Sequence, residues 1–127
     1  MSMKLQDKLK MMADYSCLAC CYLEMVGITD ERKPFFILEG MKQGFLSEDC
    51  TVVKPIEFIG LTGNENYKNV IKQTEYNEDK PVIARFVKNG YNHFVIVNGR
   101  TKKVIYNSLE KSNCVDNGVI ESYRILV

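Results

Sequence analysis

Four short runs rich in Val, Ile, Phe and Tyr fill the second half of the chain and constrain its fold most. They are PVIARFV, YNHFVIV, KKVIYNS and VIESYRILV, which begin at Pro81, Tyr91, Lys102 and Val119. Short runs of β-branched and aromatic residues predict strands. The segments KNGYN and NGRTKK separate the first three runs and suit tight hairpin turns. We therefore expect an antiparallel meander over residues 81–127.

The last run also alternates along its length, and alternate residues of a strand point to opposite faces. Strict alternation places one set of residues together on one face: Ile120, Ser122, Arg124 and Leu126. The other face then carries the remaining set: Glu121, Tyr123, Ile125 and Val127.

The first half of the chain shows helical spacing instead. From Cys17 to Val26, apolar residues recur three and four positions apart, which predicts a helix buried on more than one side. Asp14 or Ser16 can cap the start of this helix, and Gly27 can end it.

Two further helices are expected, over residues 4–13 and 29–44, the second capped by Thr29 or Asp30. Residues 50–63 fit either a short helix after Pro55 or an irregular segment. Helices followed by an antiparallel sheet define the α+β class. We expect N-terminal helices packed on a C-terminal antiparallel β-sheet in a single domain over residues 1–127, because no linker-like composition interrupts the chain.

Charge and composition exclude several classes of function. The net charge of +1 offers no basic field for a phosphate backbone, so nucleic acid is not an expected partner. No apolar run reaches the length of a transmembrane helix. The N-terminal residues lack the apolar core of a signal peptide, so we expect a chain that is cytoplasmic when synthesised. Five cysteines, an odd number, favour thiols in a reducing compartment over a disulfide framework.

Cys17, His93 and Asn107 carry the chemistry that the sequence predicts. Cys17 opens the expected buried helix, where backbone N–H groups favour a thiolate. A thiolate nucleophile needs an imidazole as base and acid, and His93 is the single histidine of the chain. Asn107 lies 14 residues later on the next expected strand, where it can orient the imidazole. The alternative is a structural histidine packed in an apolar strand.

Cys17-x-x-Cys20 also matches the spacing of a redox motif or of half a zinc site. Zinc would need Cys50, Cys114 or His93 as further ligands, and these show no paired spacing, so we expect no metal and no cofactor. A thioredoxin-type motif follows a strand, and no strand is expected before Cys17.

The order of these motifs resembles that of the papain-like cysteine peptidases. Asn92-His93-Phe94-Val95, then Gly99, then Asn107-Ser108, is similar to the NHAV…G and NS motifs of that superfamily. Within that superfamily, the bacterial members that process bacteriocin leaders look closer to this chain in size and in the HFV strand. The segments SCLACCYLEMV and VDNGVIESYRILV are also similar to an uncharacterised family of spirochaete plasmid and prophage proteins, which implies a role in phage or mobile-element biology.

The sequence departs from the papain-like pattern before the cysteine. Papain-like enzymes carry a glutamine there that donates a hydrogen bond to the oxyanion, whereas the residue six positions before Cys17 is Met11. Besides the backbone N–H of Cys17, the candidate oxyanion donors are Gln6, Tyr15 and Ser16. Loss of one such donor costs about 100- to 1,000-fold in rate.

The resemblance implies a thiol-dependent hydrolase of amide bonds, and the mobile-element likeness implies a phage-type peptidoglycan hydrolase, an endolysin that a holin releases to the cell wall. One alternative is a cytoplasmic peptidase that cleaves proteins or leader peptides. Another is a catalytically inactive relative that binds a protein. Tyr91 and Asn92, just before His93, are candidates for contacting a peptide or peptidoglycan substrate.

Overall fold

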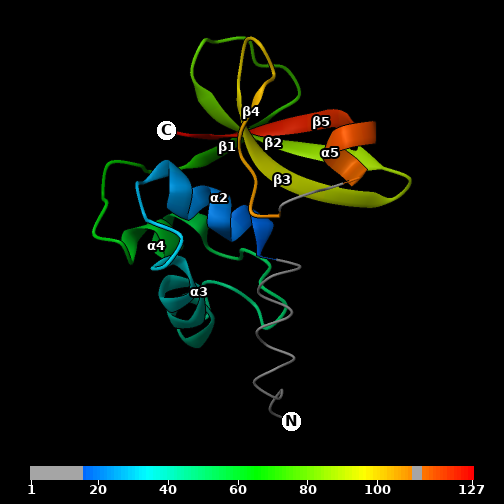
Figure 1. The fold of residues 1–127 in the computed structure, drawn as a ribbon. Helices are drawn as coiled ribbons and strands as arrows, with labels where there is room; N and C mark the ends of the chain where they lie inside the picture. The colour runs from blue at the N-terminus through cyan, green and yellow to red at the C-terminus, as the bar shows by residue number, and fades with distance from the viewer. Residues whose placement is uncertain (1–15, 110–112) are drawn as a thin grey trace. The chain divides into compact units, whose positions relative to one another are not determined.

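The structure is a computed structural model that describes residues 16–109 and 113–127 (Figure 1). The chain divides into two compact units, with the boundary in the sequence between Glu65 and Asn66. Helices occupy the first unit and an antiparallel sheet the second, so the expected α+β class is confirmed. The single domain over residues 1–127 stays a prediction, and the helix expected over residues 4–13 lies outside the described residues. No helix in the described ranges is long and apolar enough to cross a membrane.

The first helix, α2, spans Cys17–Met25 and is buried along its middle. Five consecutive residues, Ala19 to Leu23, are buried, which confirms the prediction of a helix covered on more than one side. Gly27 follows the helix with φ of +84°, a backbone conformation that side-chain-bearing residues rarely adopt. Ser16 occupies the N-cap position, but its hydroxyl contacts Cys20 Sγ instead of capping the helix.

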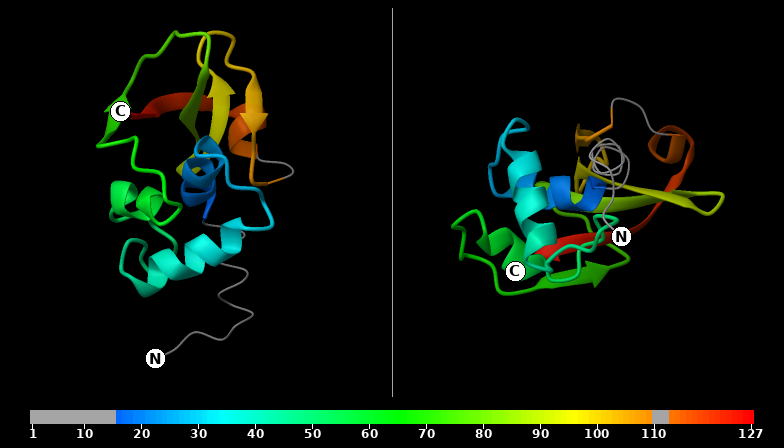
Figure 2. Two further views of the ribbon diagram at one scale, coloured as in Figure 1. Left: turned by 90° about the vertical axis from the view of Figure 1, so that its left-hand side faces the viewer. Right: turned by 90° about the horizontal axis from the view of Figure 1, so that it is seen from below.

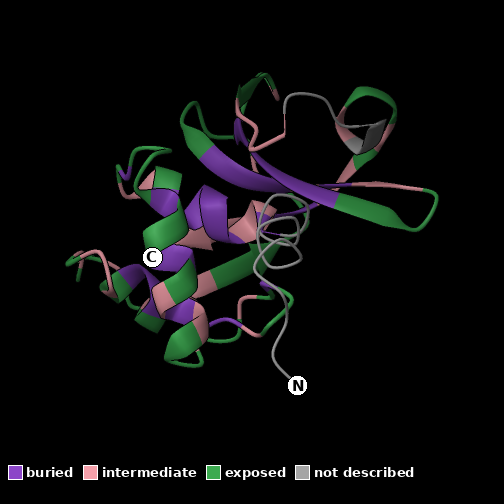
Figure 3. Cartoon of the chain, turned by 60° about the horizontal axis from the view of Figure 1, so that its bottom comes forward, coloured by how far each residue is buried: buried purple, intermediate pink, exposed green. Residues whose placement is uncertain are grey.

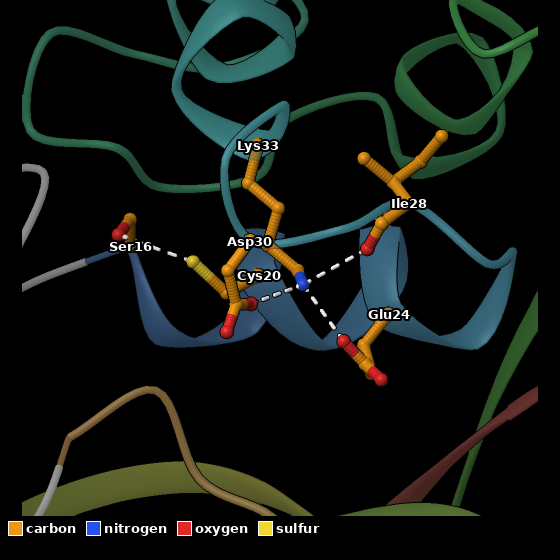
Figure 4. Close-up of polar contacts among 6 residues, drawn as sticks. All are labelled: Ser16, Cys20, Glu24, Ile28, Asp30 and Lys33. Atoms are coloured by element: carbon orange, nitrogen blue, oxygen red, sulfur yellow. Dashed lines mark hydrogen bonds and ion pairs between the residues drawn. The ribbon is translucent and has the colours of Figure 1, made fainter.

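The buried ammonium group of Lys33 ties the end of α2 to the start of α3, which spans Lys33–Lys42. Lys33 Nζ donates to Glu24 Oε1 at 2.7 Å, to Asp30 Oδ1 at 2.5 Å and to the carbonyl oxygen of Ile28 at 3.0 Å (Figure 4). The predicted caps of this helix were wrong, because residues 30–32 form a turn and the Asp30 carboxylate binds Lys33. Three acceptors around one ammonium satisfy the buried charge.

Gly40 of α3 lies against Phe58 of the short helix α4, which spans Pro55–Gly60. A Cβ atom at Gly40 would lie 2.8 Å from Phe58 Cδ1 and 3.2 Å from Leu46 Cγ, and both of these side chains are fully buried. Of the two predicted forms for residues 50–63, the short helix starting at Pro55 is therefore the one present. The ring of its Phe58 packs so close to the backbone at position 40 that only glycine fits there.

The second unit is a five-stranded antiparallel sheet in the order β1-β5-β2-β3-β4 (Figures 1 and 2). The strands span Val70–Gln73, Pro81–Lys88, Tyr91–Asn98, Val104–Tyr106 and Val119–Leu126. The meander prediction holds for β2, β3 and β4 only, because β5 returns to pair with β2. The sequence pattern missed β1, which pairs with β5, and the short helix α5, Asn113–Asn117.

The turn between β2 and β3 has the expected hairpin chemistry. Asn89 and Gly90 both have positive φ, of 51° and 85°, as a two-residue type I′ turn requires. The middle of the paired strands is buried, whereas the hairpin tip is exposed (Figure 3).

A β-bulge at Arg85/Phe86 changes which residues of β5 share a face. Ile120 joins Tyr123 and Ile125 against the buried cluster of Val82, Ala84, Phe86, Val95 and Val97. Glu121 is the extra residue of the bulge, and it joins Ser122 on the other face, where its carboxylate binds Arg85 at 2.9 Å. The predicted strict alternation was therefore wrong, because a bulge breaks the two-residue period.

We expect Gly40→Ala to destabilise the first unit. The added methyl group meets the Phe58 ring, and overpacking costs about 1–3 kcal/mol, which exceeds the gain of up to about 1 kcal/mol in helix propensity. Urea unfolding followed by circular dichroism measures the change.

Gly60→Ala is the matched control for this substitution. Gly60 ends α4, and its added Cβ would have no atom within 4 Å, so its free energy of unfolding stays equal or rises by up to about 1 kcal/mol. Equal stability of the two variants would contradict the close packing of α3 on Phe58.

Candidate functional site

His93 and Asn107 form a hydrogen-bonded pair at one end of the sheet. His93 is the third residue of β3 and lies opposite Phe86, so it shares the face of the buried apolar cluster. Asn107 directly follows β4. His93 Nε2 lies 2.7 Å from Asn107 Oδ1. The structure thus brings together the two residues that the sequence predicts as base and orienter.

The amide of Asn107 has its orientation fixed by a second hydrogen bond. The backbone N–H of Leu109 donates to Asn107 Oδ1 at 2.9 Å, and an N–H can only donate, so the atom facing both groups is the oxygen. His93 Nε2 must then carry a proton to donate to the same oxygen. The neutral imidazole consequently keeps its lone pair on Nδ1, the nitrogen that can act as a base.

The surroundings of His93 favour this neutral ring. Burial lowers the pKa of His93 below its ordinary value, and the hydrogen bond to Asn107 opposes that shift only in part. The imidazole is therefore neutral at pH 7 unless an anion comes close to it.

Ser108, the next residue after Asn107, has a buried hydroxyl. Its Oγ has no hydrogen-bond partner among the residues that the structure describes. Neither this atom nor the Leu109 N–H could be found from sequence, because both depend on the conformation of the turn after β4.

Cys17 lies in the first unit as the first residue of α2, and it is half-buried. Cys20, Cys21 and Cys50 are buried, and burial raises the pKa of the Cys21 thiol well above its usual value and that of Cys50 to about 11. At pH 7 only about one Cys50 thiol in 10,000 is ionised. Cys17 is thus more accessible than Cys20, Cys21 and Cys50. Its predicted pairing with His93 involves residues of both units and stays a prediction.

The remaining predicted site residues fall in different places. Ser16 is buried with its hydroxyl 3.6 Å from Cys20 Sγ, whereas Gln6 and Tyr15 lie outside the described residues. Alternation along β3 puts Tyr91 on the same face as His93 and Asn92 on the opposite face. Of the two candidate substrate contacts, only Tyr91, which is 75% exposed, shares the face of the imidazole.

No cluster of three or more metal-ligating side chains is present within residues 16–109 and 113–127. No family model matches the chain, and neither a curated protein nor a solved structure matches it.

We expect His93 to titrate below the ordinary histidine pKa of about 6.5. Between the lowered folded-state pKa and about 6.5, the unfolded chain binds more protons than the folded chain. The free energy of unfolding therefore falls as the pH drops from about 6.5 to the folded-state pKa. The single histidine gives one set of imidazole signals, so an NMR pH titration reads its pKa directly.

Asn107→Ala removes the hydrogen bond that raises this pKa, so the titration moves to still lower pH. Asn92→Ala is the control, because that exposed side chain points to the opposite face and leaves the titration unchanged. A higher pKa in Asn107→Ala would contradict the bond from Nε2.

Proposed function

We propose that the protein is a thiol-dependent amide hydrolase of papain-like type, with Cys17 as nucleophile, His93 as base and acid, and Asn107 as the orienting residue. The observation that carries the proposal is the shared oxygen of Asn107. It binds His93 Nε2 and the Leu109 N–H together, which holds the ring in the tautomer with a basic Nδ1.

In this mechanism, His93 Nδ1 takes the proton of Cys17 Sγ and the thiolate attacks an amide carbonyl carbon. The imidazolium then gives its proton to the leaving amine, and an acyl thioester forms on Cys17. Water hydrolyses the thioester, with His93 acting as base again. The mechanism requires Cys17 Sγ to come within about 4 Å of Nδ1. Asn107 stabilises the imidazolium, because its carbonyl oxygen faces the protonated Nε2.

The start of α2 supports the role of Cys17. Backbone N–H groups in the first turn of a helix stabilise a nearby thiolate, and the N–H of Cys17 itself is a candidate donor to the oxyanion. Gln6 and Tyr15 remain the candidates for a second donor.

We propose a peptide or amide bond of peptidoglycan as the substrate, as in a phage endolysin. The support is the small size of the chain and the similarity of SCLACCYLEMV and VDNGVIESYRILV to spirochaete plasmid and prophage proteins. Synthesis in the cytoplasm and release to the wall by a holin belong to the same proposal.

We expect the purified protein to release amino groups, and no reducing sugar ends, from purified peptidoglycan. Cys17→Ala and His93→Ala lower this rate by at least about 1,000-fold. Asn107→Ala lowers it by about 10- to 100-fold, the kinetic equivalent of one hydrogen bond to a charged group. Cys50→Ala, at a buried thiol that takes no part in the mechanism, keeps the wild-type rate.

Two outcomes would overturn parts of this proposal. Cleavage of denatured protein without any release from peptidoglycan would replace the substrate with protein or leader peptides. Lack of hydrolysis, together with alkylation of Cys17 by iodoacetamide at pH 6 that is no faster than that of Cys50, would contradict an activated nucleophile and favour a binding module.

A further inference from the structure

Cys17 and Cys20 stand three residues apart in the first turn of α2. Cα atoms at this spacing in an α-helix are about 5 Å apart, which lies inside the range of about 4.4–6.8 Å that disulfides span. Their Cβ atoms need to move closer than in a regular helix, and tightening of the first turn towards 3₁₀ geometry, where residues i and i+3 eclipse, brings them together.

The side chain of Cys20 already points back towards the start of the helix. Its Sγ lies 3.6 Å from the Oγ of Ser16, the residue that immediately precedes Cys17 (Figure 4). Side chains of an α-helix lean towards its N-terminus, so the sulfur lies over the turn that contains Cys17.

The two thiols also differ in accessibility, as a reactive and a resolving cysteine do. Cys17 is half-buried, whereas Cys20 is buried and only 9% exposed. Cys21 is fully buried, and burial raises its pKa well above the usual value, so it is a poor competitor for attack on a neighbouring sulfur.

We propose that Cys17 and Cys20 form a redox modification site that a small-molecule disulfide oxidises to a reversible intrahelical disulfide. The Cys17 thiolate attacks one sulfur of glutathione disulfide, a Cys17–glutathione bond forms, and one glutathione thiolate leaves. Cys20 loses its proton to solvent, its sulfur attacks Cys17 Sγ, and the second glutathione thiolate leaves. Two protein thiols are oxidised and one glutathione disulfide is reduced to two glutathiones.

The consequence for activity rests on the proposed function. A Cys17 sulfur held in a disulfide has no thiolate to attack an amide, so oxidation stops hydrolysis and a dithiol reductant restores it. The disulfide itself forms whether or not the protein is a hydrolase.

Reduced full-length protein is incubated with glutathione disulfide, and the remaining free thiols are then blocked with a maleimide. The mass of the intact chain is measured by mass spectrometry. We expect the wild-type chain to lose two hydrogens without a lasting adduct. Cys20→Ala keeps a glutathione adduct on Cys17 at a level at least about tenfold above wild type, because the resolving thiol is missing. Trypsin leaves Cys17, Cys20 and Cys21 in one peptide, residues 11–32, so variants assign the pairing.

Cys21→Ala is the matched control, a cysteine in the same turn whose loss leaves the disulfide intact. A disulfide that persists in Cys20→Ala but disappears in Cys21→Ala would overturn the pairing, and so would a wild-type chain that accumulates the adduct. Hydrolysis is measured on the same samples. A reduced chain with no hydrolase activity that still forms the disulfide would contradict the proposed function alone.

Discussion

The central strand β2 is paired on both of its edges, and the sheet depends on this double pairing. β3 pairs along its whole length and β5 along most of it, so one strand fixes two registers at once. Ala84 lies opposite both Val95 and Tyr123, and all three are buried. A shift by one residue would turn each of these side chains to the opposite face. The register also sets His93 opposite Phe86, on the face that carries the apolar cluster.

The position of His93 in the candidate site is fixed by that register and by the side-chain carbonyl oxygen of Asn107. Asn107 Oδ1 accepts from the imidazole and from the backbone of its own turn, so the side chain cannot swing away without losing both bonds. A ring that is buried, neutral and held by a fixed acceptor is suited to taking up a proton. At the start of α2, the accessible thiol of Cys17 contrasts with the buried thiols of Cys21 and Cys50. The proposed hydrolysis and the proposed disulfide both require the thiol of Cys17 to be accessible.

Much of the fold could be predicted from patterns of polarity. Helix α2 and strands β2 and β3 are long and strongly apolar, and Asn89-Gly90 marks the turn between the strands. The strand β1 has only four residues, of which Val70 and Ile71 alone are apolar, so it is too short to show a two-residue period. It forms a strand because the edge of β5 offers hydrogen bonds to it. The start of α3 was misplaced because Asp30 binds a buried lysine, a contact that competes with capping and is invisible in a linear pattern.

The sequence by itself determined the α+β class, the residue types of the candidate site and the pairing of His93 with Asn107, because these follow from local spacing and a single hairpin. Tertiary structure decided the place of β5 beside β2, the bulge that turns Glu121 towards Arg85, and the tautomer of His93. These features depend on hydrogen bonds between residues distant in the chain or on the conformation of a turn. Side-chain periodicity carries no information about either.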